Sequence, residues 1–282
     1  MLYELTNIIR PETDNWQQQR ARLQQTNGQV LTLAPNPGFS GLLSREGTQG
    51  HNLIDWVTQR VYHPGNYLYF NEIPTVTDAE IFMNQDRSIS LISEGDVIGE
   101  VELYANTRRA VKSVTYLNED GGRDFIEEYT FDGELFSRIF YDRNAVQEIC
   151  FYDNQQRPVI RYYYYERQLN LVTIENPETR EVITQYDTQL QFMRTQLAQR
   201  LTPDDQVNIS YLGLELSVLA ETTSQNTLYL EEAPLNEAGQ VKGNLRAILT
   251  NEVKYVQHVV ASEDAATVLK TANCPIDKLI IK

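Results

Sequence analysis

The sequence predicts an α/β protein in which a parallel sheet of Rossmann type carries an inserted antiparallel β-sheet. Three observations lead to this fold class. Segments with strand and helix patterns alternate near both ends of the 282-residue chain. Between them, apolar and polar side chains alternate with a period of two, which is typical of strands. Helical spacing then returns from Asp187. The predicted domains are therefore 1–68 with 184–282, and an insertion spanning 69–183.

The first segment has the pattern strand, helix, strand. Residues 1–6 are predicted to form a short strand, and residues 30–33 a second one. Between them, Asp14 or Asn15 can cap a helix. Asn27, followed by a glycine, is a suitable left-handed end for that helix. A strand–helix–strand order of this kind favours parallel pairing.

The next segment, 34–50, is rich in proline and glycine and is predicted to be a loop. Its glycines fit neither the dinucleotide-binding motif nor the P-loop, and it contains no lysine. No nucleotide cofactor is therefore expected here. Residues 53–61 place Ile54, Val57 and Val61 at helical spacing, which predicts a short helix.

The predicted insertion is an up-and-down meander of antiparallel strands. From residue 80 to about 183, β-branched and aromatic residues dominate the apolar positions. Polar turn clusters interrupt the strands at nearly regular spacing: 118–122, 132–133, 142–144, 153–156 and 176–179. A sheet of this kind offers a surface for contact rather than a pocket for chemistry.

Aromatic residues in the meander are candidates for a partner interface. The run 161–166 reads Arg-Tyr-Tyr-Tyr-Tyr-Glu, which puts two tyrosines on each face of one strand. Two interpretations remain open. Tyrosines suit an exposed meander, because the apolar ring can pack on the sheet while the hydroxyl meets water. Alternatively, one face of the strand contacts a partner. Because aromatic residues are common binding hot spots, the predicted interface residues are Phe151, Tyr152, Tyr162, Tyr163, Tyr164 and Tyr165.

After the meander the sequence returns to alternating helices and strands. Asp187 or Thr188 can cap a helix with Leu190, Met193, Leu197 and Leu201 on one face. Predicted strands follow at 207–212, 227–230, 255–260 and 279–281, and predicted helices at 214–221, 244–250 and 263–271.

Composition limits the classes of function. The formal net charge is −15, which argues against nucleic-acid binding through phosphates and against docking on an anionic membrane surface. There is no run of 18 apolar residues and no signal-peptide pattern at the N-terminus, so a cytoplasmic location is predicted. The cysteines and histidines have no metal-ligand spacing. No metal, cofactor or catalytic motif is expected.

Two carboxylates, Glu231 and Glu232, stand out at the end of a predicted strand. In sheets of this type, ligands bind beyond the carboxyl ends of the strands. A pair of carboxylates there can orient a sugar or peptide hydroxyl, so both are predicted acceptor-binding residues. Adjacent residues at a strand end usually point in opposite directions. A purely structural role is therefore the alternative.

The segments 69–74 (Tyr-Phe-Asn-Glu-Ile-Pro) and 228–234 (Leu-Tyr-Leu-Glu-Glu-Ala-Pro), together with the meander, resemble a known family. It is the stabilising, or chaperone, subunit of the accessory-Sec glycosyltransferase that modifies serine-rich-repeat adhesins in Gram-positive bacteria. That family has Tyr-Phe-Asn-Gln-Ile-Pro and Gln-Glu-Pro at the corresponding places. The resemblance covers nearly the whole chain, and none of its motifs is catalytic.

The resemblance implies a GT-B architecture, with two Rossmann-like halves and the meander inserted into the first. It also implies a non-catalytic subunit that pairs with a catalytic glycosyltransferase through the meander and helps to hold the Ser/Thr-rich adhesin. Its expected location is cytoplasmic or peripheral to the inner face of the cell membrane. The chain departs from the family because it stops at Lys282, about where the first half would end.

Two other functions stay open at this stage. The chain can be a fragment of an active UDP-sugar-dependent glycosyltransferase whose donor-binding half is missing. It can also be a free-standing module that binds carbohydrate or peptide.

Overall fold

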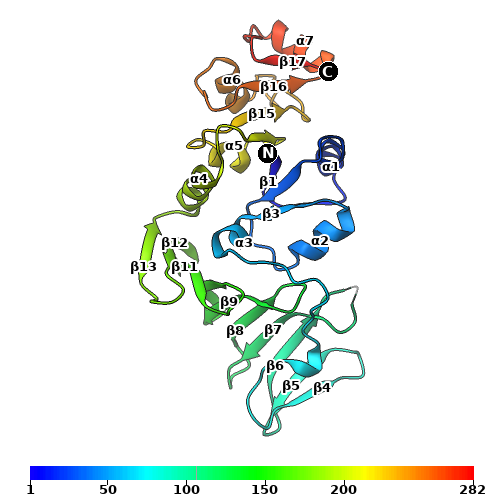
Figure 1. The fold of residues 1–282 in the computed structure, drawn as a ribbon, viewed down its shortest axis with the longest axis vertical. Helices are drawn as coiled ribbons and strands as arrows, with labels where there is room; N and C mark the ends of the chain where they lie inside the picture. The colour runs from blue at the N-terminus through cyan, green and yellow to red at the C-terminus, as the bar shows by residue number, and fades with distance from the viewer. Residues whose placement is uncertain (106) are drawn as a thin grey trace. The chain divides into compact units, whose positions relative to one another are not determined.

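The computed structural model describes residues 1–105 and 107–282. These residues form a seven-stranded parallel sheet with helices and a separate ten-stranded antiparallel sheet, which confirms the predicted α/β fold class (Figure 1). The chain divides into two compact units. The first unit comprises Met1–Ala34, Glu46–Leu53 and Leu190–Lys282, and the second comprises Pro35–Arg45 and Ile54–Gln189. The domain limits expected from the sequence, 69 and 183, stay a prediction.

The parallel sheet of the first unit has the strand order β17-β16-β15-β14-β1-β2-β3. The strands are β1 (Leu2–Thr6), β2 (Gln29–Thr32), β3 (Gly50–Asn52), β14 (Gln206–Ile209), β15 (Gln225–Tyr229), β16 (His258–Ala261) and β17 (Leu279–Ile281). From the central pair β1 and β14, the chain adds strands outward in both directions. This reversal of strand order is the switch point at which doubly wound sheets bind ligands.

The helices that accompany this sheet are α1 (Asp14–Thr26), α4 (Gln189–Arg200), α5 (Leu214–Val218), α6 (Gly243–Leu249) and α7 (Glu263–Thr271). In α1, the side chains of Trp16, Gln19 and Leu23 are buried, at a spacing that places them on one face. Central strand residues such as Leu5 and Ile209 are fully buried. The helices and the parallel sheet thus enclose an apolar core, because parallel sheets are normally covered by helices.

The N-terminal elements confirm most of the predicted pattern. Asn27 ends α1 in the left-handed conformation (φ 52°), as predicted. The predicted N-cap, Asp14 or Asn15, is wrong. The N-cap is Thr13, whose hydroxyl oxygen accepts a hydrogen bond from the Trp16 backbone N–H. The predicted helix over 53–61 ends earlier, as α3 (Leu53–Thr58).

The prediction of a loop over 34–50 is wrong. Residues Phe39–Glu46 form a helix, α2, and Gly50 begins β3. The glycines of this segment serve other purposes than loop flexibility. A side chain at Gly41 would meet the Phe131 ring at 2.9 Å, and Gly47 (φ 64°) follows the helix in the left-handed region.

The antiparallel sheet of the second unit runs in sequence order from β4 to β13 (Figure 1). Its strands are β4 (Glu80–Met83), β5 (Ile89–Ser93), β6 (Asp96–Leu103), β7 (Val111–Leu117), β8 (Arg123–Tyr129), β9 (Leu135–Asp142), β10 (Ala145–Tyr152), β11 (Pro158–Tyr165), β12 (Gln168–Glu175) and β13 (Val182–Tyr186). The short helix η1 (Phe70–Glu72) precedes it. The predicted up-and-down meander is therefore present.

The predicted turn clusters join consecutive strands of this sheet. Several turn residues have positive φ, including Gly121, Gly133 and Asn144. At Gly133 a side chain would lie 2.2 Å from the Leu68 backbone nitrogen, so this turn requires glycine for space as well as for φ. The segment before β4 contributes Ile73 to an apolar cluster with residues of the sheet such as Leu91.

Candidate functional site

A crevice opens at the carboxyl ends of β1 and β14, where the strand order reverses. Its volume is about 380 Å³, and residues that follow β1, β14 and β15 line it. They include Asn7, Arg10, Leu212, Glu215 and Glu232. The crevice therefore lies where the topology of a doubly wound sheet predicts a ligand site.

The acidic side chains of this crevice both have partners. One Glu215 carboxylate oxygen accepts the Asn7 backbone N–H at 2.9 Å, and this side chain is buried. Glu232 is exposed and forms an ion pair with Lys242. Arg10 is exposed at the rim and gives the crevice one positive charge.

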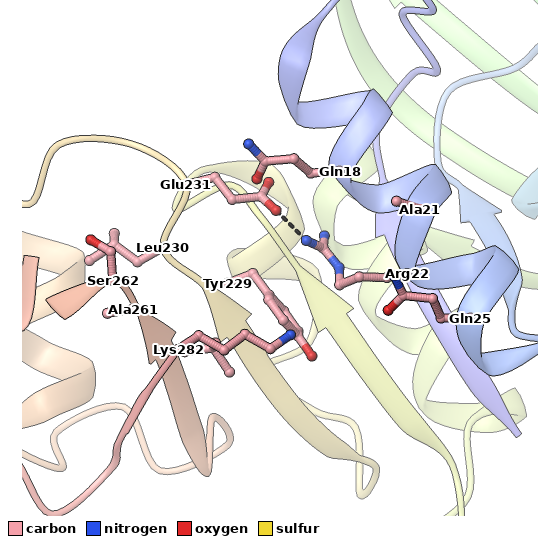
Figure 2. Close-up of a pocket in the computed structure, with 11 residues that line it drawn as sticks. Gln18, Ala21, Arg22, Gln25, Tyr229, Leu230, Glu231, Ala261, Ser262 and Lys282 are labelled. Carbon is pink, nitrogen blue, oxygen red and sulfur yellow. Dashed lines mark hydrogen bonds and ion pairs between the residues drawn. The ribbon is translucent and has the colours of Figure 1, made fainter.

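A second cavity, of about 490 Å³, lies between the side of α1 and the ends of β15 and β16 (Figure 2). Gln18, Ala21, Arg22 and Gln25 line it from one face of the helix. Tyr229, Leu230, Glu231, Val260, Ala261, Ser262 and Lys282 line it from the sheet. The residues that line it are polar, apolar and charged.

Arg22 is the centre of a buried charge network beside this cavity. Its Nε and Nη2 donate to the two carboxylate oxygens of Glu4 at 2.9 and 2.8 Å. Nη2 also donates to the Ser210 hydroxyl at 3.0 Å, and Nη1 forms an ion pair with Glu231. The guanidinium carbon lies 4.1 Å from the centre of the Tyr229 ring, a cation–π distance.

Burial sets the protonation of this network. Desolvation raises the pKa of Glu4, while hydrogen bonds from Arg22 and Asn208 oppose the rise. Burial alone would lower the pKa of Arg22, but the carboxylates of Glu4 and Glu231 outweigh it and raise that pKa. The guanidinium therefore stays charged and compensates buried negative charge.

The structure separates the two predicted acceptor-binding residues. Glu231 turns toward Arg22 and lines the cavity beside α1, whereas Glu232 lines the switch-point crevice. Both residues follow the end of β15 at Tyr229, and their side chains line different cavities. The two carboxylates do not form one pair, and their role in acceptor binding stays a prediction.

The predicted interface aromatics differ strongly in exposure. Phe151, Tyr152 and Tyr162 are buried, Tyr163 and Tyr164 are half-buried, and 66% of Tyr165 is exposed. The Phe151 ring packs edge-on against the Phe136 and Tyr162 rings, at 5.6 and 5.1 Å between centroids. Direct contact with a partner is thus open only to Tyr163, Tyr164 and Tyr165, for which an interface role stays a prediction.

Sequence reasoning did not find Glu4, Arg22 or Glu215. A signal for Glu4 exists, because a glutamate inside the short apolar strand β1 needs a buried partner. Nothing in the sequence pairs it with Arg22 or joins Arg22 to Glu231, which lies 209 positions away.

Among the described residues, no three His, Cys, Asp or Glu side chains are grouped to hold a metal ion. Burial lowers the pKa of His51. None of the helices in ranges 1–105 and 107–282 is long and apolar enough to cross a membrane.

No protein-family model and no curated protein matches the chain. Solved structures match it along its whole length. The pneumococcal O-GlcNAc transferase GtfA in complex with UDP and GlcNAc matches with a TM-score of 0.80 at 12% identity. The match covers 100% of this chain and 59% of that one.

Two multi-protein complexes contain a similar chain. Accessory secretory protein 1, 2 and 3 of Streptococcus pneumoniae gives a TM-score of 0.75 at 14% identity, over 100% of this chain and 61% of that one. The Glycosylation Associate Protein (Gap123) complex of Streptococcus agalactiae gives 0.73 at 13%, over 100% and 60%. The chain thus spans about 60% of the solved chains that it matches. The predicted resemblance, including the GT-B-like half with its inserted sheet, is confirmed as a shared fold.

Proposed function

We propose that the chain is a non-catalytic stabilising and substrate-recognition subunit of a protein O-GlcNAc transferase complex that glycosylates serine-rich-repeat adhesins. Its partner is a catalytic glycosyltransferase subunit, which it contacts through the antiparallel sheet. The fold supports this proposal, because similar chains occur in an O-GlcNAc transferase, a glycosylation-associated complex and an accessory secretory complex. The proposed place of action is the cytoplasm, either free or peripheral to the inner face of the cell membrane.

The observation that carries the proposal is the exposed apolar character of both edge strands of the antiparallel sheet. On β4, 52% of Phe82 and 47% of Met83 are exposed, and on β13, 54% of Val182 and 64% of Ile183. Among the strands that the structure describes, each edge strand pairs on one side only, so its other side offers unpaired backbone groups. Apolar side chains beside an unpaired edge mark a surface that a partner can cover.

The switch-point crevice is the proposed place of acceptor recognition. It lies at the carboxyl ends of the central strands, where doubly wound sheets bind ligands. Glu215 accepts a backbone N–H and Glu232 forms an ion pair with Lys242. We assign the crevice to binding of the Ser/Thr-rich acceptor, with Glu232 at its edge.

Co-purification with the catalytic subunit tests the partner role. Ile183→Asp and Phe82→Asp place a charge on each exposed edge, and Val61→Asp is the matched control. Val61 belongs to the same unit and is 61% exposed, but it lies outside the sheet. We expect at least one edge variant to lower capture about tenfold, as loss of a hot spot does. Capture by both at the level of Val61→Asp would refute the proposal.

An active fragment of a UDP-sugar-dependent enzyme is the alternative, favoured by the TM-score of 0.80 to GtfA. Calorimetry with UDP-GlcNAc on this chain, followed by a turnover assay without a partner, separates the two functions. Tight binding with turnover would establish the enzyme.

A further inference from the structure

We propose that the cavity beside α1 is a binding site for a neutral saccharide, with Glu231 as the hydroxyl acceptor (Figure 2). This site lies apart from the switch-point crevice, which Glu232 lines. The inference rests on the proposed function only for the source of the saccharide.

Glu231 has a carboxylate oxygen without a hydrogen-bond partner among the described residues. The Glu231 side chain is only 6% exposed, and one oxygen receives a hydrogen bond from Arg22. Its Oε2 is buried and has no hydrogen-bond partner among the described residues. A buried acceptor that stays unpaired destabilises the fold by its desolvation. A donor supplied by a ligand would remove this cost.

Arg22, the partner of the other Glu231 oxygen, has a hydrogen-bond donor to spare. Arg22 has five N–H groups. Glu4 and Ser210 take Nε–H and both Nη2–H groups, and Glu231 takes one on Nη1. Within the described part of the chain, the second Nη1–H of Arg22 has no acceptor. A hydroxyl both donates and accepts, so neighbouring hydroxyls of a sugar ring match this pair.

The charges of the site favour a neutral ligand. Two carboxylates, Glu4 and Glu231, face two cations, Arg22 and Lys282, in or beside the cavity. An anion would find most of the guanidinium donors already bound to carboxylates. A cation would meet Lys282, whose ammonium lies over the Tyr229 ring at 5.2 Å from its centre.

Size and lining agree with a saccharide of one or two rings. A volume of about 490 Å³ lies in the range of small-molecule sites. The exposed amides of Gln18 and Gln25 on α1 add donors and acceptors at the entrance. Gln18 points toward Glu231 in Figure 2, so rotation of this exposed side chain can open a path to the buried oxygen.

The test titrates the ¹⁵N-labelled chain with methyl N-acetyl-β-glucosaminide and follows the resonances of the Arg22 Nε–H and the 229–231 amides. We expect saturable shifts at these positions. Glu231→Gln keeps an oxygen for Arg22 but replaces Oε2 with an NH₂ donor, and should weaken binding at least about tenfold, or about 1.4 kcal/mol. Glu232→Gln, which changes the other crevice, should leave the affinity unchanged.

Gln18→Phe provides a second test, because it fills the entrance without touching the Arg22 network. It should also abolish the shifts, which keeps the test valid if Glu231→Gln unfolds the first unit. Absence of saturable shifts, or equal binding by wild type and Gln18→Phe, would overturn the proposal.

A Ser/Thr-rich peptide with and without O-linked GlcNAc identifies the source of the saccharide. Binding of the glycopeptide and the free sugar, but not of the bare peptide, supports a glycan site. Equal binding of both peptides in this cavity would overturn the saccharide assignment. Failure here leaves capture of the catalytic subunit unchanged, so it is distinguishable from failure of the proposed function.

Discussion

Replacing Arg22 with Met should destabilise the first unit by more than loss of a surface ion pair would. Glu4 is fully buried, Glu231 is 6% exposed and Arg22 is 12% exposed, so the substitution leaves two buried carboxylates. Glu4 keeps the hydrogen bond from the Asn208 amide at 2.8 Å. Breaking a buried pair from one side costs about 3–5 kcal/mol. We expect a loss of that size in the free energy of unfolding.

Tryptophan fluorescence can report this loss for the first unit alone. The chain has two tryptophans, and Trp16 lies on α1 with 1% of its surface exposed. Measured in a Trp56→Phe background, Trp16 follows unfolding of the helix that carries Arg22. With an m-value of about 2 kcal/mol/M, the expected decrease of the urea midpoint is roughly 2 M.

The triple variant Glu4→Gln/Arg22→Met/Glu231→Gln separates the buried charge from lost packing. It removes both carboxylates that pair with Arg22, so most of the stability should return, because neutral replacement of a whole buried ion cluster is often nearly neutral. Protonation of the Glu4 carboxylate should also reduce the loss of stability. A carboxyl whose folded-state pKa is raised binds its proton more tightly in the folded state, so stability falls as pH rises above 4.5. If the triple variant is no more stable than Arg22→Met, or the loss is independent of pH, the reasoning is wrong.

Two further predictions concern single positions. Gly50→Ala would put a carbon 2.0 Å from the Val30 carbonyl oxygen, and should lower the stability of the first unit by about 1–3 kcal/mol. Gly243→Ala, where nothing lies within 4 Å, should not lower it in the same urea titration. Burial raises the pKa of Asp55 to about 7, against the opposing charge of Arg60. The second unit should therefore lose stability as pH rises from about 3.8 to 7, and Trp56 fluorescence of Asp55→Asn in a Trp16→Phe background should show a weaker pH dependence.

The meander was predictable because its signals are local. Period-two alternation and turn residues specify consecutive antiparallel strands without reference to distant parts of the chain. The same local rules identify α1 and its end at Asn27. Pro- and Gly-rich composition misled the prediction for α2, since Gly41 is needed there for its close approach to Phe131.

The Arg22 network was not predictable because its partners are joined only by the fold. Glu4 and Glu231 lie on either side of Arg22 in the sequence, 18 and 209 positions away. Strand order and register bring them together, and neither is readable from the sequence. The tyrosine run at 161–166 did not predict which of its side chains are exposed, for a related reason. Alternation along β11 shifts between Tyr163 and Tyr164, so residue spacing alone does not give the burial of each ring.

The different cavities that Glu231 and Glu232 line determine how any role of these residues has to be tested. A variant that changes both carboxylates alters two cavities at once, one beside α1 and one at the switch point. If such a double variant lost binding, the result would not show which cavity holds the ligand. Glu232 is exposed and its ion pair with Lys242 contributes little, whereas Glu231 stands in a buried network. Only the two single substitutions, each checked for stability, separate acceptor recognition from saccharide binding.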